Sequence, residues 1–464
     1  MSSNYSKISI VKRWVFLLLP CPLSIRIFKK VLSNHVEQNK LEAAKFVELA
    51  ILAYGSKYYF SSKFLKFPFE LGQITIDSET KKYFFLCLKT LRREPRLRKV
   101  FSSELTRIVG EIPKHKLDAQ SWKLFSLIMS GFGFIKAGTI ARRNFVEVAT
   151  DEANRNCVSS RTLHQLIRGL LESRRFEEAK SYIDQSTDAL NITSTNILYG
   201  DYLAMMTHSR PRVDHLNPLT ESDEQKFFQA LIKDKSVALV ATAEINSESG
   251  SEIDSMDTVA RVKFQGPDIM PDKRFAGTRC DITAYTEDLV EKFSSKSVKS
   301  SNYLDFLKTV KVVVVKQKSK AKIGNTPTRN MPVWAPTFLT TATSGTLLIF
   351  DIARYSPSTI KLFGFNFYTH RNLYNSALLK FYERQGSLRD IGLPKNWFKF
   401  SSERKNSAII AAGFVSHDPR SDFLLVKNLY ELSGLIDGTP EVLEILNLTA
   451  DQYDARLEEM LGDW

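Results

Sequence analysis

Short runs of β-type residues recur through the second half of the chain, and helical stretches separate them. The runs, rich in Val, Ile, Phe and Tyr, are SVALVAT (236–242), DTVARVKF (257–264), TVKVVVVKQ (309–317) and TIKLFGFNFY (359–368). A further apolar run, SGTLLIFDIARY (344–355), fits a helix better than a strand. Strands that alternate with helices predict an α/β domain, with a mostly parallel sheet and helices on its faces.

Residues 35–210 are predicted to be helical. Apolar residues recur at helical spacing in 37–55, 80–93, 119–138 and 160–186. The last two stretches resemble helix–turn–helix units, and LLESRRFEEAKSYI resembles the second half of a tetratricopeptide-type repeat with Ala179 as its small packing residue. We therefore expect a helical-hairpin, repeat-like domain, of the kind that binds partners or braces another domain.

The polar, proline-containing stretch 208–226 predicts a boundary between the two regions. The α/β domain is then expected over 225–435. An acidic C-terminal helix is expected over residues 436–464, which include PEVLEILNLTADQYDARLEEMLGDW (440–464).

The net charge of +14 is concentrated at the N-terminus, where residues 1–100 carry 19 Lys and Arg against 7 Asp and Glu. Such a surplus favours contact with lipid head groups or nucleic acid, or simply a solvated helical face. Within it, residues 1–34 hold WVFLLLPCPLSI between cations, a run too short to span a bilayer and interrupted by Pro20 and Pro22. We expect a membrane-interface anchor or a buried helix here, and no nucleic-acid partner, because no RNA-module signature is present.

The four cysteines, Cys21, Cys87, Cys157 and Cys280, lie far apart and form no C-x-x-C pair. This usage predicts reduced thiols in a cytoplasmic protein. The chain also has no convincing Asp-x-Asp site for a divalent metal ion, so no metal ligands are expected.

The stretch SGSEIDSMDTVARVKF (249–264) is the first candidate for a nucleotide site. Ser249 and Gly250 can let backbone amides approach a phosphate, and Asp254 can hold the loop through turn hydrogen bonds. Arg261 lies in an apolar strand and needs a partner there, for which an acid of the loop is the candidate. The alternative is a strand–loop–strand unit with ordinary turn residues.

A second candidate begins at Thr343, Ser344 and Gly345, which precede an apolar helix. Hydroxyls and free amides at a helix N-terminus can bind an anion. The strand that follows ends at Gly364. A capped helix without a ligand is the alternative.

Two histidines are candidates for acid–base chemistry. His417 stands between an apolar run and an amphipathic helix, where Asp418 or Asp422 could orient it. His370 lies in FYTHRNLY. Either histidine can equally be structural or exposed.

These segments follow the order and rough spacing of the sialyl motifs of the sialyltransferases, glycosyltransferase family 29, which the stretch 230–435 resembles. GSEIDSMDTVARVKF is similar to the large motif, and Gly277, Thr278 and Arg279 are similar to its end. TSGTLLIFDIARYSPSTIKLFGF resembles the small motif, through Ser344 with Gly345 and Gly364 with Phe365. His417 and Asp422 are similar to the very small motif, His-x4-Glu, and His370 falls at the third motif.

The sequence departs from these motifs at four places. Ala241-Thr242 replaces the Gly-Asn whose amide reads the nucleotide, Lys263 replaces a second Asn, and Asp422 replaces the Glu. The Cys pair of secretory-pathway members is absent, and its places fall near Ser236 and Tyr355. The last departure favours a cytoplasmic, bacterial-type enzyme, bound peripherally at the inner face of the membrane.

The resemblance implies a Rossmann-type fold and a metal-independent, inverting transferase that needs no cofactor beyond its CMP-sugar donor. Sialic acid or a related acid sugar would pass to a hydroxyl of a glycan or glycolipid acceptor, in the synthesis of surface polysaccharide or glycolipid. His417 would be the general base and Asp422 would orient it, while the helix N-terminus at Ser344 and Gly345, with Lys263 or His370, would stabilise the departing phosphate. The nucleotide would be held by Thr242, Ser249, Gly250, Asp254, Arg261, Lys263, Thr343, Ser344, Gly345 and Gly364. The alternatives are a CMP-Kdo-dependent transferase, or a helical scaffold with an inactive transferase domain.

Overall fold

The computed structural model describes residues 102–103, 106–107, 109–111, 113–131, 133–155, 157–189, 194–206, 223–264, 266, 271–287, 290, 306–316, 326–331, 337–339, 342–370, 374–379 and 417–462. The predictions for the basic segment 1–34 and for the helices at 37–55 and 80–93 lie outside these residues.

The chain divides into two compact units, residues 1–162 with 454–464, and residues 163–453. The described elements of the first unit are η2 (Lys114–Lys116), α6 (Ala119–Gly131) and α7 (Ile135–Asn154), with the first residues of α8 and most of α21. The indole of Trp122 in α6 is fully buried and donates to the Lys114 carbonyl at 2.9 Å. Thr139 of α7 donates to Asp454 of α21 at 2.8 Å, which attaches the C-terminal helix to this unit.

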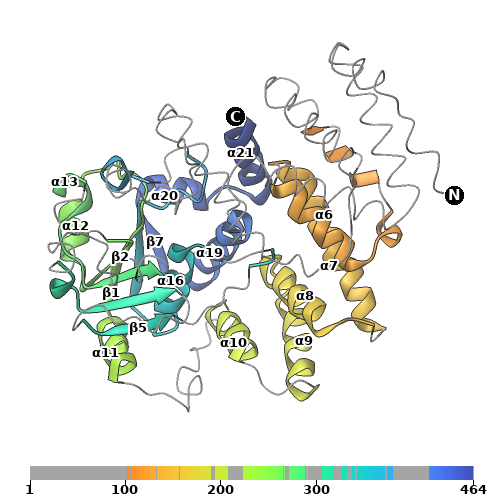
Figure 1. The fold of residues 1–464 in the computed structure, drawn as a ribbon, viewed down its shortest axis with the longest axis horizontal. Helices are drawn as coiled ribbons and strands as arrows, with labels where there is room; N and C mark the ends of the chain where they lie inside the picture. Colours follow the sequence, from red (N-terminus) through yellow and green to blue (C-terminus); the bar gives the residue numbers. More distant parts are fainter. Residues whose placement is uncertain are drawn as a thin grey trace, which may run out of the picture. The chain divides into compact units, whose positions relative to one another are not determined.

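The second unit holds the sheet and most of the helices around it (Figure 1). Its helices are most of α8 (Ser160–Glu172), α9 (Phe176–Ala189), α10 (Ser194–Met206), α11 (Asp223–Ile232), α12 (Gly250–Ser255), α13 (Lys273–Ala276), η5 (Phe306–Thr309), α16 (Ser344–Ala353), α19 (Pro419–Ser433), α20 (Pro440–Leu446) and the first residues of α21 (Ala450–Gly462). Its strands are β1 (Ser236–Val240), β2 (Thr258–Val262), β3 (Ile282–Thr286), β4 (Val312–Lys316), β5 (Thr328–Met331), β6 (Thr359–Phe363) and β7 (Ile436–Gly438).

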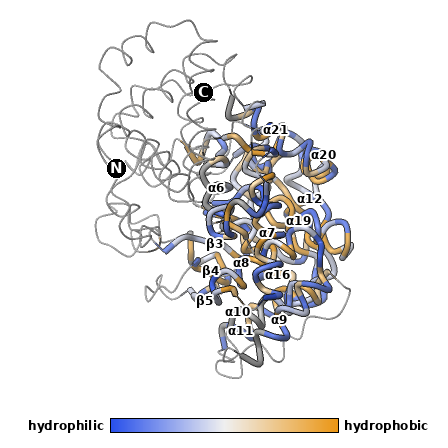
Figure 2. The backbone as a smooth tube through the Cα atoms, turned by 90° about the vertical axis from the view of Figure 1, so that its right-hand side faces the viewer, coloured by the Kyte–Doolittle hydropathy of each residue, from blue (hydrophilic) through white to orange (hydrophobic). Residues whose placement is uncertain are grey.

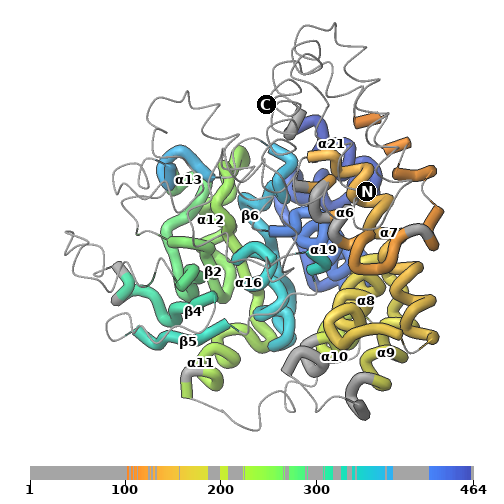
Figure 3. Tube along the Cα trace, turned by 45° about the vertical axis from the view of Figure 1, so that its right-hand side comes forward, coloured from red at the N-terminus to blue at the C-terminus, as the bar shows by residue number. Residues whose placement is uncertain are grey.

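The seven strands form one parallel sheet in the order β5-β4-β3-β2-β1-β6-β7. The expected parallel α/β sheet with flanking helices is therefore confirmed. The strand order runs outward in one direction from β1 to β5 and reverses at β1, where β6 joins the other side. Figure 3 shows the consequence, since β6 comes from late in the chain yet lies beside the early strands.

Three strands were not predicted, and the boundaries differ from those expected. β5 and β7 are short, and β3 and β5 carry polar residues that hide the strand pattern. The compact unit around the sheet begins at Leu163 instead of near residue 225, so α8, α9 and α10 belong with the sheet. Residues 436–462 form a strand and two helices, where one helix was predicted for 436–464. The repeat array over 35–210 stays a prediction.

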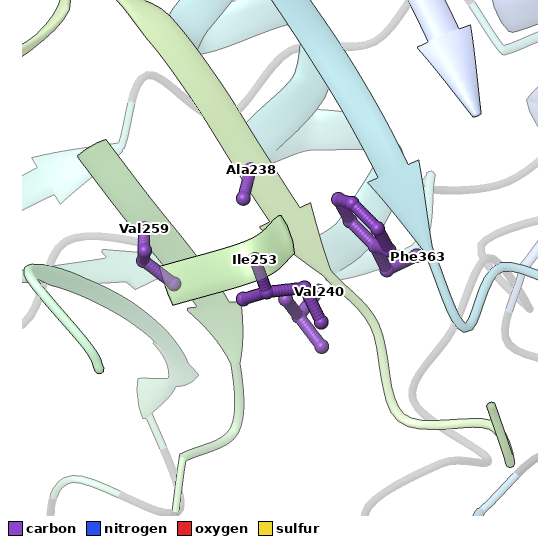
Figure 4. Packing of buried hydrophobic residues seen from close by; sticks show 5 residues of the cluster. All are labelled: Ala238, Val240, Ile253, Val259 and Phe363. Atoms are coloured by element: carbon purple, nitrogen blue, oxygen red, sulfur yellow. The ribbon is translucent and has the colours of Figure 1, made fainter. Parts of the chain in front are cut away.

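One face of the sheet is covered by α12. Ile253 of this helix is fully buried against Ala238 and Val240 of β1, with Val259 of β2 and Phe363 of β6 beside it (Figure 4). Apolar and polar stretches alternate along the chain, as elements with one buried face require (Figure 2). Burial of these side chains stabilises the fold by about 1.5–3 kcal/mol for each large one.

The other face carries α16, all ten residues of which are buried. A Cβ at Gly345 would lie 3.9 Å from Val262, whose side chain points away from the α12 face because neighbouring strand residues alternate. Buried ion pairs fix this helix: Asp351 binds Arg329 of β5, and Arg354 donates to Asp201 of α10 at 2.9 Å. Among the described helices, none is both long and apolar enough to cross a membrane.

Candidate functional site

The reversal of strand order brings the carboxyl ends of β1 and β6 together. Ala241 donates its N–H to the Phe363 carbonyl at 2.8 Å, and Ala243 donates to the Gly364 carbonyl at 3.2 Å. Gly364 has φ +64°, and a Cβ there would lie 3.0 Å from the Ala243 carbonyl oxygen. Glycine is needed at 364 because its φ is positive and the Ala243 carbonyl lies close to it. In open α/β sheets, ligands bind outside the carboxyl ends of the strands at the point where the strand order reverses.

A pocket of about 50 Å³ lies at this edge. Its lining comes from the ends of β1 and β2 and from two later segments: Val240, Ala241, Thr242, Ala243, Ile245, Arg261, Val262, Lys263, Phe264, Pro271, Ala276, Asn375 and Leu378. Three residues predicted to bind nucleotide, Thr242, Arg261 and Lys263, therefore meet in one place. Typical ligand pockets measure roughly 300–1,000 Å³, so a ligand as large as a nucleotide would place only one group here.

Lys263 is the cation at the mouth of this pocket. Its Nζ donates to the Tyr374 hydroxyl at 3.0 Å and lies 4.9 Å from the centre of that ring. Its backbone is in the left-handed region, with φ 55°. Phe367 and Tyr368, which follow β6, are also left-handed. Such conformations cost about 1–3 kcal/mol each and gather at functional sites.

The segment that carries Tyr374 is held across the end of β1. Asn375 donates its N–H and its Nδ2 to the Thr242 carbonyl, at 2.7 and 3.2 Å. Ser376 donates its N–H to the Glu244 carboxylate at 2.8 Å. The backbone of Thr242 therefore positions this segment, while its half-buried side chain lines the pocket.

Arg261 is buried in β2, but its partners differ from the one expected. Its Nε donates to the Arg279 carbonyl and its Nη2 to the Ala276 carbonyl, both at 2.7 Å. Backbone carbonyls of the α13 turn are its hydrogen-bond partners, and the charge of Asp254, an acid of the predicted loop, acts on the guanidinium without a direct bond. Burial lowers the pKa of Arg261. Its role is to fix this turn beside the pocket.

The loop residues Ser249, Gly250 and Asp254 hold α12 against α13. A Cβ at Gly250 would lie 1.9 Å from the Lys273 carbonyl oxygen, so the glycine permits close packing of the two helices. The Asp254 carboxylate accepts the N–H groups of Thr278 and Arg279 at 2.8 and 2.9 Å. Ser249 is buried as the N-cap residue of α12 and pairs with the Ser247 hydroxyl at 2.8 Å. All three residues therefore have structural roles.

The N-terminus of α16 is capped from within the protein. The Thr343 hydroxyl accepts the Thr346 N–H at 3.3 Å, and the Thr343 N–H donates to Oδ2 of Asp422 at 3.0 Å. Ser344 is buried, and a Cβ at Gly345 would lie 2.9 Å from the Phe365 ring. An anion at this helix end would meet the Asp422 carboxylate.

Asp422 and Lys316 are two buried residues of opposite charge at the same edge, and the charge of each favours the charged form of the other. Lys316, the last residue of β4, is 5% exposed and Asp422 is 2% exposed. Burial raises the pKa of Asp422 to about 7, against the hydrogen bond from Thr343, and lowers the pKa of Lys316 to about 8. The Asp422 charge also helps to raise the pKa of buried Tyr368, whose shift is due mainly to burial.

The start of α19, where Asp422 lies, is fixed by a polar network. Asp418 caps the helix, accepting the Ser421 N–H at 3.2 Å and the Leu339 N–H at 2.9 Å. The Ser421 hydroxyl donates to Glu172 of α8 at 2.6 Å, and Arg420 binds the same carboxylate at 2.6 Å. His417 directly precedes this network and is half-buried, whereas His370 is exposed on the segment after β6.

The predicted site residues thus fall into three groups. Thr242, Arg261 and Lys263 line the pocket, with Gly364 next to Ala243 of its wall. Thr343, Ser344, Gly345 and Asp422 lie at the start of α16, and Ser249, Gly250 and Asp254 brace α12. Sequence reasoning missed Lys316, Tyr374 and Asn375. A lysine that ends an all-valine run was a signal for Lys316, but the loop carrying Tyr374 gave none.

No protein-family model matches the chain, and no curated protein is significantly similar to it. In the part of the chain that the structure describes, no three His, Cys, Asp or Glu side chains gather as metal ligands would.

Proposed function

We propose that this protein is a glycosyltransferase that moves an acid sugar from a CMP-activated donor to an acceptor hydroxyl. The observation that supports this most strongly is the pocket at the switch point of the parallel sheet, with Lys263 at its mouth. The motifs that resemble the sialyl motifs supply the residues at this edge, from Thr242 to Asp422. The particular sugar, sialic acid or Kdo, follows from the resemblance alone.

The chemistry needs stabilisation of the phosphate that leaves with CMP. Lys263 can supply a positive charge to that phosphate, and Lys316 adds a second cation to the same edge. Fixed charges in a site that excludes water stabilise a leaving group strongly. Direct displacement at the anomeric carbon, through an oxocarbenium-like transition state, inverts the configuration of the sugar. The acceptor hydroxyl must lose its proton to a base at this edge, for which the sequence predicts His417.

The acceptor and the site of action stay expectations from the sequence. A glycan or glycolipid acceptor on the cytoplasmic face of a membrane agrees with the basic first hundred residues, which lie outside the described part of the chain.

Turnover of a donor panel tests the proposal. The protein is incubated with CMP-sialic acid, CMP-Kdo, UDP-glucose and GDP-mannose, and nucleotide release is followed by chromatography. We expect release from one of the two CMP-sugars and none from the UDP- or GDP-sugars. Release from a UDP- or GDP-sugar alone would assign another donor class, and no release with no CMP binding would favour the inactive scaffold.

A further inference from the structure

One oxygen of the Asp422 carboxylate has no protein partner. Oδ2 accepts the Thr343 N–H at 3.0 Å, but Oδ1 is buried and receives no hydrogen bond from any described residue. Buried polar atoms are nearly always paired, and one that is not requires an explanation. The neighbouring carboxylate of Asp418 makes the contrast clear, because each of its oxygens accepts a backbone N–H, from Leu339 at 2.9 Å and from Ser421 at 3.2 Å.

The position of this oxygen is set by three elements. Asp422 lies in the first turn of α19, the N–H that it accepts belongs to the cap of α16, and Lys316 ends β4. All three meet at the carboxyl edge of the sheet, where the strand order reverses nearby at β1. A carboxylate held in this way has one oxygen engaged and the other buried without a partner, so it is a fixed acceptor for the hydroxyl of a ligand.

We propose that Oδ1 of Asp422 binds the acceptor hydroxyl at the N-terminus of α16 and takes its proton, in the role that the sequence assigned to His417. The inference rests on the proposed function for its donor. The hydroxyl oxygen bonds to the anomeric carbon, and the bond from that carbon to the phosphate oxygen breaks, its electron pair leaving with CMP. The proton passes from the hydroxyl to Oδ1.

The surroundings of Asp422 suit a base that works near neutral pH. Asp418, on the same helix, raises the pKa of the Asp422 carboxyl, whereas Lys316 from β4 and the Thr343 N–H lower it. Burial has the largest effect, and the resulting pKa is about 7. Tyr368, from the segment after β6, is close enough for the Asp422 charge to raise its own pKa. A general base is most effective when its pKa lies near the working pH.

Hydrolysis of the donor provides the test, because water is the smallest acceptor hydroxyl. CMP release from whichever CMP-sugar the wild type uses is measured from pH 5 to 9 for wild type, Asp422→Asn, His417→Ala and Asp418→Asn. CMP affinity and melting temperature are measured in parallel. We expect the wild-type rate to fall as pH drops through about 7.

Asp422→Asn is expected to lose at least 100-fold in rate together with this pH dependence, while CMP affinity changes less than threefold and the melting temperature at pH 8 is not lowered. Asp418→Asn, whose carboxylate is fully hydrogen-bonded, should lower the melting temperature and keep the pH dependence. If Asp422→Asn retains its turnover and pH dependence while His417→Ala is inactive, the role of Asp422 as base is overturned and the proposed function is not. A wild type that binds no CMP and releases none would overturn the proposed function, and the inference with it.

Discussion

Lys316 and Asp422 hold the two sides of one peptide group, the one that joins Ala342 to Thr343. Lys316 Nζ donates to the Ala342 carbonyl at 2.7 Å, and the Thr343 N–H donates to Asp422 Oδ2 at 3.0 Å. Both side chains are buried, and they come from β4 and α19. The peptide that begins α16 is therefore clamped between two charges, and the orientation of this helix end depends on both.

The free energy of unfolding should depend on pH through the titration of Asp422. Its folded pKa of about 7 lies above the usual value of 3.8, so the protonated form favours folding and that stability is lost as pH rises toward 7. Between pH 5 and 8 the loss from this group is about 2–3 kcal/mol. Urea unfolding of wild type and Asp422→Asn is measured at both pH values. The difference between the two proteins gives the contribution of Asp422 to the free energy of unfolding, separate from that of the other carboxyls. Equal pH dependence in the two proteins would show that Asp422 does not titrate in this range.

Replacing Lys316 by Met should move the pH dependence of turnover. Removing the cation disfavours the carboxylate form of Asp422, so its pKa should rise and the acid limb of the rate profile should shift to higher pH. A shift of roughly one unit, with lower thermal stability because the Ala342 carbonyl loses its donor, is the expected result. An unchanged midpoint would separate Lys316 from the chemistry.

Lys263→Ala should weaken binding of CMP but not of cytidine, because the lysine is assigned to the phosphate. A loss of about tenfold in CMP affinity corresponds to about 1.4 kcal/mol, a reasonable value for one charge-assisted contact. The control is Lys311→Ala, a half-exposed lysine paired with Asp281 at 2.9 Å just before β4, at the opposite edge of the sheet. Titration calorimetry with both ligands checks this. Equal losses for CMP and cytidine would place Lys263 elsewhere on the nucleotide.

The parallel sheet could be predicted from the sequence, because buried strands such as β1 and β4 appear there as short apolar runs. β3, β5 and β7 did not, since Thr283, Arg329 and Asp437 interrupt the pattern and their partners come from distant segments. The site could be placed only in part. Lys263 and Asp422 were named from motif position, but the clamp of Lys316 and the contact of Tyr374 depend on which strands become neighbours. Arg261 was predicted to need a partner, and only the fold shows that carbonyls supply it.

Gly250→Ala tests the structural role found for the loop before β2. Its Cβ would lie 1.9 Å from the Lys273 carbonyl, so α12 and α13 must separate, at a cost of about 1–3 kcal/mol or more. The matched control is Gly200→Ala, at an exposed position of α10, where a Cβ meets nothing within 4 Å. That variant should be more stable by about 0.5–1 kcal/mol. Chemical denaturation measures both, and a neutral Gly250→Ala would mean that the glycine serves a ligand instead of packing.

A crystal structure of the protein soaked with CMP tests the central claim most directly. We predict CMP at the carboxyl edge of the sheet, with a base or ribose group in the pocket beside Thr242 and the phosphate in contact with Lys263 Nζ, on the side of the α16 N-terminus and Asp422. CMP bound at another surface would contradict the account. So would a pocket that does not bind CMP but binds a different nucleotide.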